Sequence, residues 1–224
     1  MKIALFGYGK MGRKISELAI KKGYSIVLKC DENNPAIKNK LSNVDVAIDF
    51  STPDSAFENI SHALKNNIPV VSGTTAWLNK IEDIYQLCNN KNGAFLYSSN
   101  FSVGVNVFFD INRKLAKIMK KLDYKISISE IHHTQKVDSP SGTAITLYDD
   151  LIKIMNDREI PIKSKRIDNE IGTHEVTYTS EIDKISFKHE AKNREGFALG
   201  ALLSAKWILD KKGIFNFGDV LKDI

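Results

Sequence analysis

Lys2-Ile-Ala-Leu-Phe-Gly-Tyr-Gly-Lys-Met-Gly12 says more about the architecture of this chain than any other segment. Lys2–Phe6 is typical of a short apolar strand, and residues 11–22 carry apolar side chains at helical spacing. Between them, Gly7–Gly12 fits the pattern G-x-G-x-x-G. The pattern alone is weak evidence, but a dinucleotide-binding fold requires it at this junction of strand and helix. We therefore expect a pyrophosphate over the N–H groups at the start of the helix.

The N-terminal part of the chain continues this alternation of strand-like and helix-like segments. Alternation of the βαβα type favours a parallel, doubly wound sheet with helices on both faces. Further strands are predicted at 24–30, 44–50, 69–72 and 94–97, and helices at 55–65 and 78–89.

The pattern changes after Asn100. A long amphipathic helix, a strand, a polar loop and another helix follow, and two alternating runs then indicate an antiparallel hairpin. These segments are expected at 107–122, 124–129, 130–143, 144–155, 173–179 and 184–189, before a final helix at 197–209. We predict a Rossmann-like dinucleotide-binding domain of residues 1–102 and 195–224. Residues 103–194 would form an inserted α+β domain with a mixed or antiparallel sheet, for substrate binding and oligomerisation.

Composition and charge restrict the classes of partner. The 224 residues are 42% hydrophobic and carry a formal net charge of +5, with lysines scattered over the whole length. An arginine-rich run or a basic stripe interleaved with aromatic residues, which would favour nucleic acid, is absent from the sequence. Cys30 and Cys88 have neither metal-ligand spacing nor a disulfide framework. The apolar run at 1–6 is too short for a signal peptide, so we expect a cytoplasmic protein without nucleic-acid or membrane partners.

A carboxylate that binds ribose is expected about 20 residues after the glycine turn, at the end of the second strand. Asp31 stands there, with Glu32 beside it. Because an acid accepts hydrogen bonds from a ribose 2′-hydroxyl and repels a 2′-phosphate, we expect NADH to be favoured over NADPH. Lys29 and Lys38 soften this preference, and a solvated acidic loop is the alternative interpretation.

Two further polar segments end strands of the same predicted sheet. Ser72–Thr75 and Ser98–Phe101 supply hydroxyls, a glycine and an amide at positions where open α/β sheets bind ligands. Such groups suit contacts to a ribose and to a nicotinamide carboxamide. Ordinary turn chemistry explains either segment alone, whereas the two together favour a cofactor.

The loop Glu130–Ala144 concentrates groups that can do chemistry. Two imidazoles, a lysine and a Ser-Gly-Thr turn fall within it. They offer a proton donor near neutral pH, a cation for an anionic substrate, and N–H groups at a helix start. Consecutive histidines such as His132 and His133 rarely share one metal ion, and no helix with a third ligand is evident, so no metal is expected.

Seven motifs together now resemble the 4-hydroxy-tetrahydrodipicolinate reductase family, formerly called the dihydrodipicolinate reductases. They occur in order and reach almost from end to end: Gly7–Gly12, Asp49–Pro53, Ser72–Thr75, Ser98–Asn106, Glu130–Ala144, His189–Arg194 and Phe197–Ala201. The resemblance implies reduction of 4-hydroxy-tetrahydrodipicolinate with NADH or NADPH, loss of water, and formation of tetrahydrodipicolinate in lysine and diaminopimelate biosynthesis. It also implies a homotetramer built through the sheet of the second domain.

The resemblance assigns roles by motif position. His132 would be a catalytic proton donor or acceptor, and Lys136 would donate a proton at the substrate. The residues implied to bind the small dicarboxylate substrate are His133, Ser141, Gly142 and Thr143. Those implied to hold the cofactor are Gly7, Tyr8, Gly9, Lys10, Met11, Gly12, Asp31, Gly73, Thr74, Thr75, Ser98, Ser99, Asn100 and Phe101. Many family members have one more residue in the glycine turn, and many have arginine where this chain has Glu32.

Two other functions stay open on sequence grounds. One is a dehydrogenase of another small acid that uses the same type of cofactor domain, and the other is a nicotinamide-binding regulator that has lost its chemistry. Lys136 and His132 argue against the regulator, because a sensor has no use for a proton donor. We interpret His174 and His189 as structural, whereas Arg194 fits either a hinge contact or a substrate contact and is not assigned to catalysis. Whether His132 or Lys136 delivers the final proton also stays open.

Overall fold

The computed structural model describes residues 1–156 and 159–223, which divide into two compact units. The first unit comprises Met1–Ser102 together with the chain from Phe197 onward, and the second comprises Val103–Gly196. The boundaries expected from the sequence lie after residues 102 and 194. Within the described ranges, no helix combines the length and the apolar character needed to cross a bilayer.

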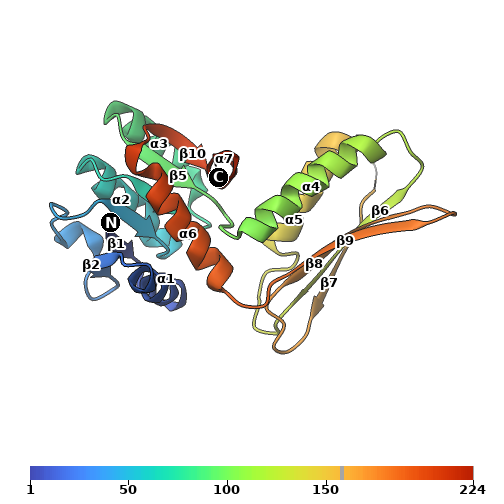
Figure 1. Ribbon diagram of the computed structural model, residues 1–224, viewed down its shortest axis with the longest axis horizontal. Helices are drawn as coiled ribbons and strands as arrows, with labels where there is room; N and C mark the ends of the chain where they lie inside the picture. The colour runs from blue at the N-terminus through green and yellow to red at the C-terminus, as the bar shows by residue number, and fades with distance from the viewer. Residues whose placement is uncertain (157–158, 224) are drawn as a thin grey trace. The chain divides into compact units, whose positions relative to one another are not determined.

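A parallel six-stranded sheet forms the centre of the first unit (Figure 1). Its strands are β1 (Lys2–Phe6), β2 (Ser25–Cys30), β3 (Val46–Asp49), β4 (Val70–Ser72), β5 (Ala94–Tyr97) and β10 (Gly213–Asn216). The order is β10-β5-β4-β3-β1-β2, and every pairing is parallel. The chain runs outward from β1 to β2 and then returns to β3 on the other side of β1. Ligands bind at the carboxyl ends of strands at such a reversal.

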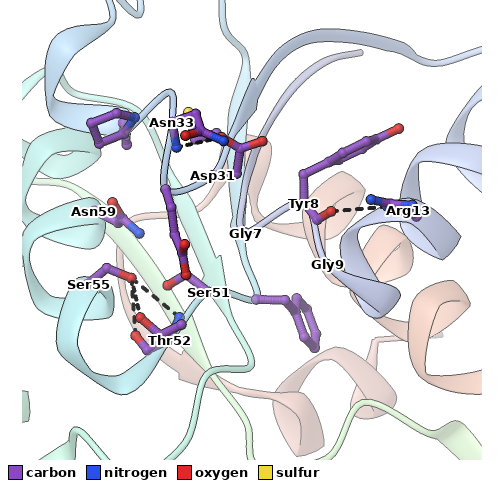
Figure 2. A pocket seen from close by; sticks show the side chains of 15 residues that line it. Gly7, Tyr8, Gly9, Arg13, Asp31, Asn33, Ser51, Thr52, Ser55 and Asn59 are labelled. Atoms are coloured by element: carbon purple, nitrogen blue, oxygen red, sulfur yellow. Dashed lines mark hydrogen bonds between the residues drawn. The ribbon is translucent and has the colours of Figure 1, made fainter.

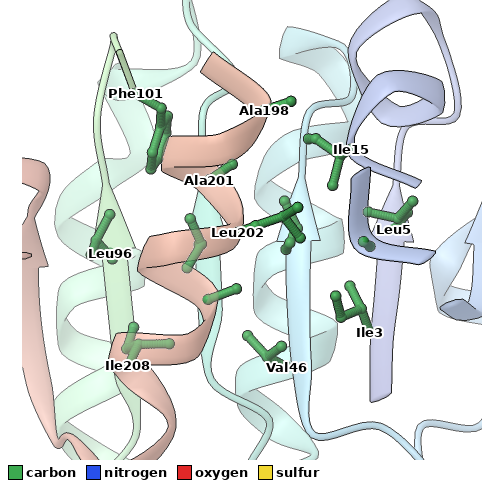
Figure 3. Packing of buried hydrophobic residues seen from close by; sticks show 14 of the residues in the cluster. Ile3, Leu5, Ile15, Val46, Leu96, Phe101, Ala198, Ala201, Leu202 and Ile208 are labelled. Atoms are coloured by element: carbon green, nitrogen blue, oxygen red, sulfur yellow. The ribbon is translucent and has the colours of Figure 1, made fainter. Parts of the chain in front are cut away.

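Helices cover both faces of this sheet, which explains its nearly continuous apolar strands. They are α1 (Lys10–Lys21), α2 (Pro53–Lys65), α3 (Ile81–Asn90), α6 (Glu195–Trp207) and α7 (Phe217–Lys222), with short 3-10 turns η1 (Ala36–Lys38), η2 (Leu78–Lys80) and η3 (Ile208–Asp210). One buried cluster joins the sheet to α1, α6 and α7, and a second joins it to α2 and α3. Figure 3 shows the first, in which Ala198, Ala201 and Leu202 of α6 pack near Leu96 and Val46.

The start of α2 shows how local sequence sets a boundary. Thr52 and Ser55 form a reciprocal capping box, and Pro53 occupies the first helical position. Proline fits there because its missing N–H has no acceptor within a helix and its φ angle is already helical. The helix therefore begins at Pro53, ahead of the start at Ser55 that apolar spacing predicts.

The second unit contains a mixed four-stranded sheet with helices on one face (Figure 1). Its elements are α4 (Val103–Met119), β6 (Lys125–His132), α5 (Gly142–Met155), β7 (Ile162–Arg166), β8 (Thr173–Thr179) and β9 (Lys184–Glu190). In the order β7-β6-β8-β9, β6 is parallel to β7, and the other pairs are antiparallel. Apolar side chains of α4 and α5 pack on alternate residues of the strands, such as Ile128, Val176 and Tyr178.

The predicted fold class, a Rossmann-like parallel sheet with a separate mixed sheet, is confirmed. Two strands were not predicted. β7 and β10 are edge strands of their sheets. β7 reads Ile-Lys-Ser-Lys-Arg and β10 reads Gly-Ile-Phe-Asn, and neither has more than two apolar residues. An edge strand has one fewer neighbour and tolerates charge, so its apolar signature is weak. The strand expected at 124–129 also extends to His132, which therefore lies in the sheet and not in a loop.

Candidate functional site

A cavity of about 470 Å³ lies where the strand order of the first unit reverses. Its lining comes from the segments that follow β1, β2 and β3, including Gly7 to Gly9, Asp31 and Ser51 (Figure 2). Three segments distant in sequence thus meet at the carboxyl ends of adjacent parallel strands. This is the place that the glycine pattern and Asp31 predict for a dinucleotide.

The glycine turn brings its backbone close to neighbouring segments. Gly7 has φ +91°, and a Cβ there would collide with the carbonyl of Phe50. A Cβ on Gly12 would collide with the carbonyl oxygen of Gly7, so α1 can pack against the turn only with glycine there. At Gly9, by contrast, a Cβ would meet no atom within 4 Å. The first turn of α1 has neither a capping side chain nor an acidic residue, so its N–H groups fit a pyrophosphate.

Asp31 is exposed at the rim of this cavity. Its Oδ1 accepts hydrogen bonds from the N–H groups of Asn33 and Asn34, both at 3.0 Å, which hold the loop after β2 in a tight turn. Arg13 lines the same cavity, a contribution that the sequence analysis missed, and its Nε donates to the carbonyl of Tyr8 at 3.4 Å. Lys29 Nζ lies 4.6 Å from the centre of the Tyr8 ring. Acidic and basic groups therefore both border the cavity.

Asp49 is a fully buried carboxylate at the end of β3. It accepts hydrogen bonds from the hydroxyls of Ser51 at 2.6 Å, Ser72 at 2.8 Å and Thr74 at 2.8 Å. Burial raises its pKa, and the hydrogen bonds oppose that rise. The hydroxyl of Thr74 also accepts from the N–H of Ser51 at 2.9 Å. Asp49 thus ties the turns after β3 and β4 together beneath the cavity.

The other residues expected at the cofactor take different places. Lys10, Met11, Gly12, Gly73, Thr74, Thr75, Ser98, Ser99, Asn100 and Phe101 are not among the residues lining the cavity. Phe101 is buried against Phe50 and Phe217, with ring centroids 5.6 and 5.4 Å apart. Ser98 Oγ donates to the carbonyl of Asn100 at 2.8 Å, so this side chain shapes its own turn. These turns nevertheless end β4 and β5, which are strands of the same parallel sheet.

In the second unit, strand register gathers polar side chains on the helix-covered face. Alternation along β6 places Glu130 and His132 on the buried side. His132 pairs with Arg166 of β7, and Glu130 pairs with His174 of β8. Directly paired residues of adjacent strands point to the same face, so three strands bring these four side chains together.

Glu130 is the centre of this cluster, with no exposed surface. Both of its oxygens accept the N–H of Ser141 at 3.1 Å, and Arg166 Nη1 and Nη2 lie 3.4 Å from Oε1. Burial raises the pKa of the carboxyl, but hydrogen bonds from His174 and Ser141 outweigh that effect and hold the pKa well below its usual value. The buried carboxylate is therefore ionised at neutral pH.

His132 is 7% exposed, and its Nδ1 lies 3.3 Å from Oε2 of Glu130. Burial and the neighbouring His174 lower the pKa of His132 to about 4, although Glu130 opposes the shift. The imidazole is therefore neutral at neutral pH. A neutral imidazole is a weak acid, so this environment suits an acceptor better than the proton donor near neutral pH that residue type alone indicates.

The ligand atoms of Glu130, His132 and His174 lie within 4.8 Å of one another, a spacing that metal sites share. The donor set nevertheless fits a metal poorly. A dication here would stand beside the guanidinium of Arg166, and the N–H of Ser141 already contacts both carboxylate oxygens. We assign the cluster to hydrogen bonding between protein groups.

Ser141 caps α5, its Oγ accepting the N–H of Ala144 at 3.2 Å. The same oxygen lies 3.0 Å from His174 Nε2, so the hydroxyl is buried and fully engaged within the protein. Gly142, the first residue of the helix, is exposed. N–H groups in the first turn of a helix have no acceptor inside it. The turn therefore presents backbone donors, while the Ser141 side chain holds it in place.

Lys136 forms an ion pair with Asp138, its Nζ lying 2.7 Å from Oδ1. Arg166 steadies this loop by donating to the carbonyls of Lys136 at 3.3 Å and Asp138 at 2.6 Å. His133 Nε2 lies 3.4 Å from Nη2 of Arg194, the residue for which the sequence leaves a hinge contact and a substrate contact open. Through Arg166 and Glu130, the structure joins Lys136, His132 and Ser141.

Two models of one protein family match the N-terminal and the C-terminal part of this chain. The family model described as "Dihydrodipicolinate reductase, N-terminus" matches residues 1–101, and the model for the C-terminus of the same family matches residues 104–221. A 4-hydroxy-tetrahydrodipicolinate reductase from Christiangramia forsetii is 49% identical over 239 residues, covering 100% of this chain and 99% of the relative. One from Thermosipho africanus is 37% identical, covering 100% and 99%.

Solved structures share the fold. A dipicolinate-bound dihydrodipicolinate reductase from a Paenisporosarcina species has a TM-score of 0.81 at 22% identity, with 98% of each chain covered. An aspartate dehydrogenase from Thermotoga maritima has a TM-score of 0.53 at 18% identity, covering 96% of this chain and 99% of the other. The two family models together span nearly all residues, and the curated relatives match over the full length. The chain therefore belongs to the dihydrodipicolinate reductase family.

Proposed function

We propose that the cavity of the first unit binds the nicotinamide cofactor, that the polar cluster of the second unit binds the substrate, and that Lys136 delivers the final proton. The reaction is the one of the family, reduction of 4-hydroxy-tetrahydrodipicolinate to tetrahydrodipicolinate with loss of water, in lysine and diaminopimelate biosynthesis. One observation carries the site assignment. Contacts of Glu130 and Arg166 hold the loop of Lys136, the imidazole of His132 and the start of α5 at Ser141 in one cluster.

Bound NAD(P)H would supply the hydride. The first turn of α1 and the open backbone at Gly9 would hold its pyrophosphate, and Asp31 would accept hydrogen bonds from its ribose. The turns Gly73–Thr75 and Ser98–Phe101 would contact its nicotinamide half. In support of this, they end β4 and β5, and the hydrogen bonds of Asp49 and Ser98 shape their backbones.

The substrate is a small dicarboxylate, and the second unit offers groups of the right charge. Lys136 and His133 would bind carboxylates with their side chains, and Gly142 and Thr143 would bind them with backbone N–H groups at the start of α5. Ser141 would act through its backbone and by capping the helix. Its hydroxyl is not accessible to a substrate, because the whole residue is only 3% exposed. A bound carboxylate would compete with Asp138 for the Lys136 ammonium.

Charge balance requires a proton donor at the substrate. Hydride addition to a ring carbon sends negative charge toward the ring nitrogen, so the reduction needs one proton in addition to the hydride, and one water leaves. Lys136 is an ammonium in its ion pair and can give that proton, then regain one from solvent. The pKa of His132 is lowered to about 4, so its neutral ring would accept a hydrogen bond from the substrate rather than supply the proton.

Purified protein with freshly made substrate is expected to oxidise NADH in proportion to substrate, as followed by the absorbance of the reduced nicotinamide. Omitting the substrate controls for background oxidation, and a keto acid of another class, which NADH can reduce, controls for a general dehydrogenase. Binding of NADH without turnover would contradict the proposal.

NADH is the proposed preferred cofactor, and Asp31→Ser tests the reason. Loss of the carboxylate is expected to raise KM for NADH by about tenfold, from roughly 1.4 kcal/mol of lost hydrogen bonding, and to improve use of NADPH. Arg13 would then face a 2′-phosphate with one opposing acid fewer, since Glu32 also lines the cavity. KM for both cofactors is measured alongside Asp83→Ser, an exposed acid on α3. Equal effects of the two variants, or an unchanged cofactor ratio in Asp31→Ser, would remove Asp31 from the ribose site.

A homotetramer built through the sheet of the second unit is also part of the proposal. Helices α4 and α5 pack on one face of that sheet. The alternate residues of β6 and β8, such as Ser127, Ser129 and Thr177, are partly exposed on the other face. Partly exposed serines and threonines on a sheet face next to an edge strand suit association with a second copy of the sheet.

A further inference from the structure

We infer that Glu130 is a positioning residue for the reduction, which fixes the tautomer of the His132 imidazole and the place of the turn at Ser141. This inference rests on the proposed function of the second unit and adds a residue that cannot itself reach the substrate. The Glu130 side chain has no exposed surface, so it can act only through the groups that it touches.

The contacts of Glu130 come from its own strand, β6, and from three other segments. Oε1 faces the guanidinium of Arg166 on β7, and both oxygens accept the N–H of Ser141 ahead of α5. Oε2 faces His132 Nδ1 at 3.3 Å and His174 Nε2 at 3.7 Å. A buried carboxylate is stable only when such partners surround it, so each segment is held in a defined place relative to the others.

The orientation of His132 toward this carboxylate decides which ring nitrogen carries the proton. Nδ1 is buried and lies 3.3 Å from Oε2, although the two atoms do not form a hydrogen bond. A proton on Nδ1 is attracted by the carboxylate, whereas a lone pair there would be repelled. A neutral imidazole has one N–H, so Nε2 is left as the acceptor. The carboxylate of Glu130 thus prepares the ring for a donor on the substrate.

The same carboxylate places the start of α5. Its two hydrogen bonds to the N–H of Ser141 fix the residue before Gly142, and His174 holds the Ser141 hydroxyl from the other side at 3.0 Å. One buried group therefore connects the imidazole of His132 with the backbone donors proposed for the substrate carboxylates. An ion pair that served only stability would need no contact with His132 or with the start of α5. Buried ion pairs also add little net stability compared with apolar packing.

The tautomer is measured directly by nitrogen NMR of protein labelled with ¹⁵N-histidine. We expect His132 to carry its proton on Nδ1 at neutral pH in the unaltered protein, and to populate both tautomers in Glu130→Gln, because an amide can accept from Nδ1 or donate to it. Glu181→Gln, which removes an exposed carboxylate between β8 and β9, is the matched control. An unchanged Nδ1–H tautomer in Glu130→Gln would overturn the inference. This measurement needs no turnover, so it stands apart from any failure of the proposed function.

A double-mutant cycle tests whether Glu130 acts through His132. Glu130→Gln is expected to lower kcat by about 10- to 100-fold, the range for a group that orients a functional histidine, without changing NADH affinity. In a His132→Asn background the same change should lower kcat by less than about threefold, because the imidazole that Glu130 orients is gone and the amide oxygen of glutamine can still accept the N–H of Ser141. Equal losses in both backgrounds would overturn the inference. If Glu130→Gln does not fold, Glu130→Asp enters both experiments, because its shorter side chain draws the carboxylate back from Nδ1. A smaller Nδ1–H population than in the unaltered protein is then expected, together with a smaller loss of kcat in the His132→Asn background, and no change in either would overturn the inference.

Discussion

Lys136→Ala is expected to lower kcat by about a thousandfold and to leave the dissociation constant of NADH within about twofold of its original value. The change removes both the proposed proton source and a carboxylate-binding cation. It leaves the cavity in the first unit untouched, because the residues that line it all belong to that unit. Steady-state rates give kcat, and quenching of protein fluorescence gives NADH affinity.

Lys136→Arg separates the two jobs of the side chain. Arginine keeps the positive charge but does not release its proton in proteins, so substrate KM should change little while kcat falls nearly as far as in Lys136→Ala. Lys153→Ala, an exposed lysine of α5, is the matched control and should retain activity. Full kcat in Lys136→Arg would show that another group, with His132 the nearest candidate, delivers the proton.

Asp49→Ala is expected to destabilise the first unit by about 1–3 kcal/mol for each buried hydroxyl left without an acceptor, and to weaken NADH binding more than tenfold. Removal of the carboxylate leaves the hydroxyls of Ser51, Ser72 and Thr74 buried without their acceptor. Ser51 lines the cavity, so the turn that carries it should loosen as well. Urea unfolding, followed by the loss of NADH binding, reports on this unit.

Asp49→Asn keeps an acceptor oxygen in nearly the same volume and should destabilise the unit by less than Asp49→Ala. Asp210→Ala removes an exposed acid of the same unit and serves as the control. If Asp49→Ala unfolded at the same urea concentration as Asp210→Ala, the buried hydrogen bonds would have no net role in stability.

The sequence is informative wherever function depends on local spacing. The glycine turn, the acid after the second strand and the loop at 130–144 are each contained within a few residues, so the backbone geometry they require is visible in the order of residue types. Fold class follows from the same kind of signal, because strands buried on both faces are continuously apolar. These features account for the cavity residues that were predicted, such as Gly7 and Asp31.

The cluster around Glu130 depends on pairings that no local pattern reveals. Arg166 reaches Glu130 only because β7, a strand with little apolar character, pairs in parallel with β6. His174 lies beside Glu130 because of the antiparallel register of β6 and β8. His132 illustrates the consequence, since its identity suggests a titration near neutral pH while its burial lowers the pKa to about 4. Residue type was visible in the sequence, but the environment was not.

The insertion of the second unit has a consequence for the order in which the chain is made. Strand β10 pairs with β5, and α6 and α7 supply Ala198, Leu202 and Phe217 to the core beneath the sheet. All of these residues follow Val103–Gly196 in the chain. During synthesis the ribosome must therefore produce the whole second unit while β5 still has an unpaired edge and one core layer is incomplete. The first unit can therefore complete its sheet and its core only after the second unit has been made.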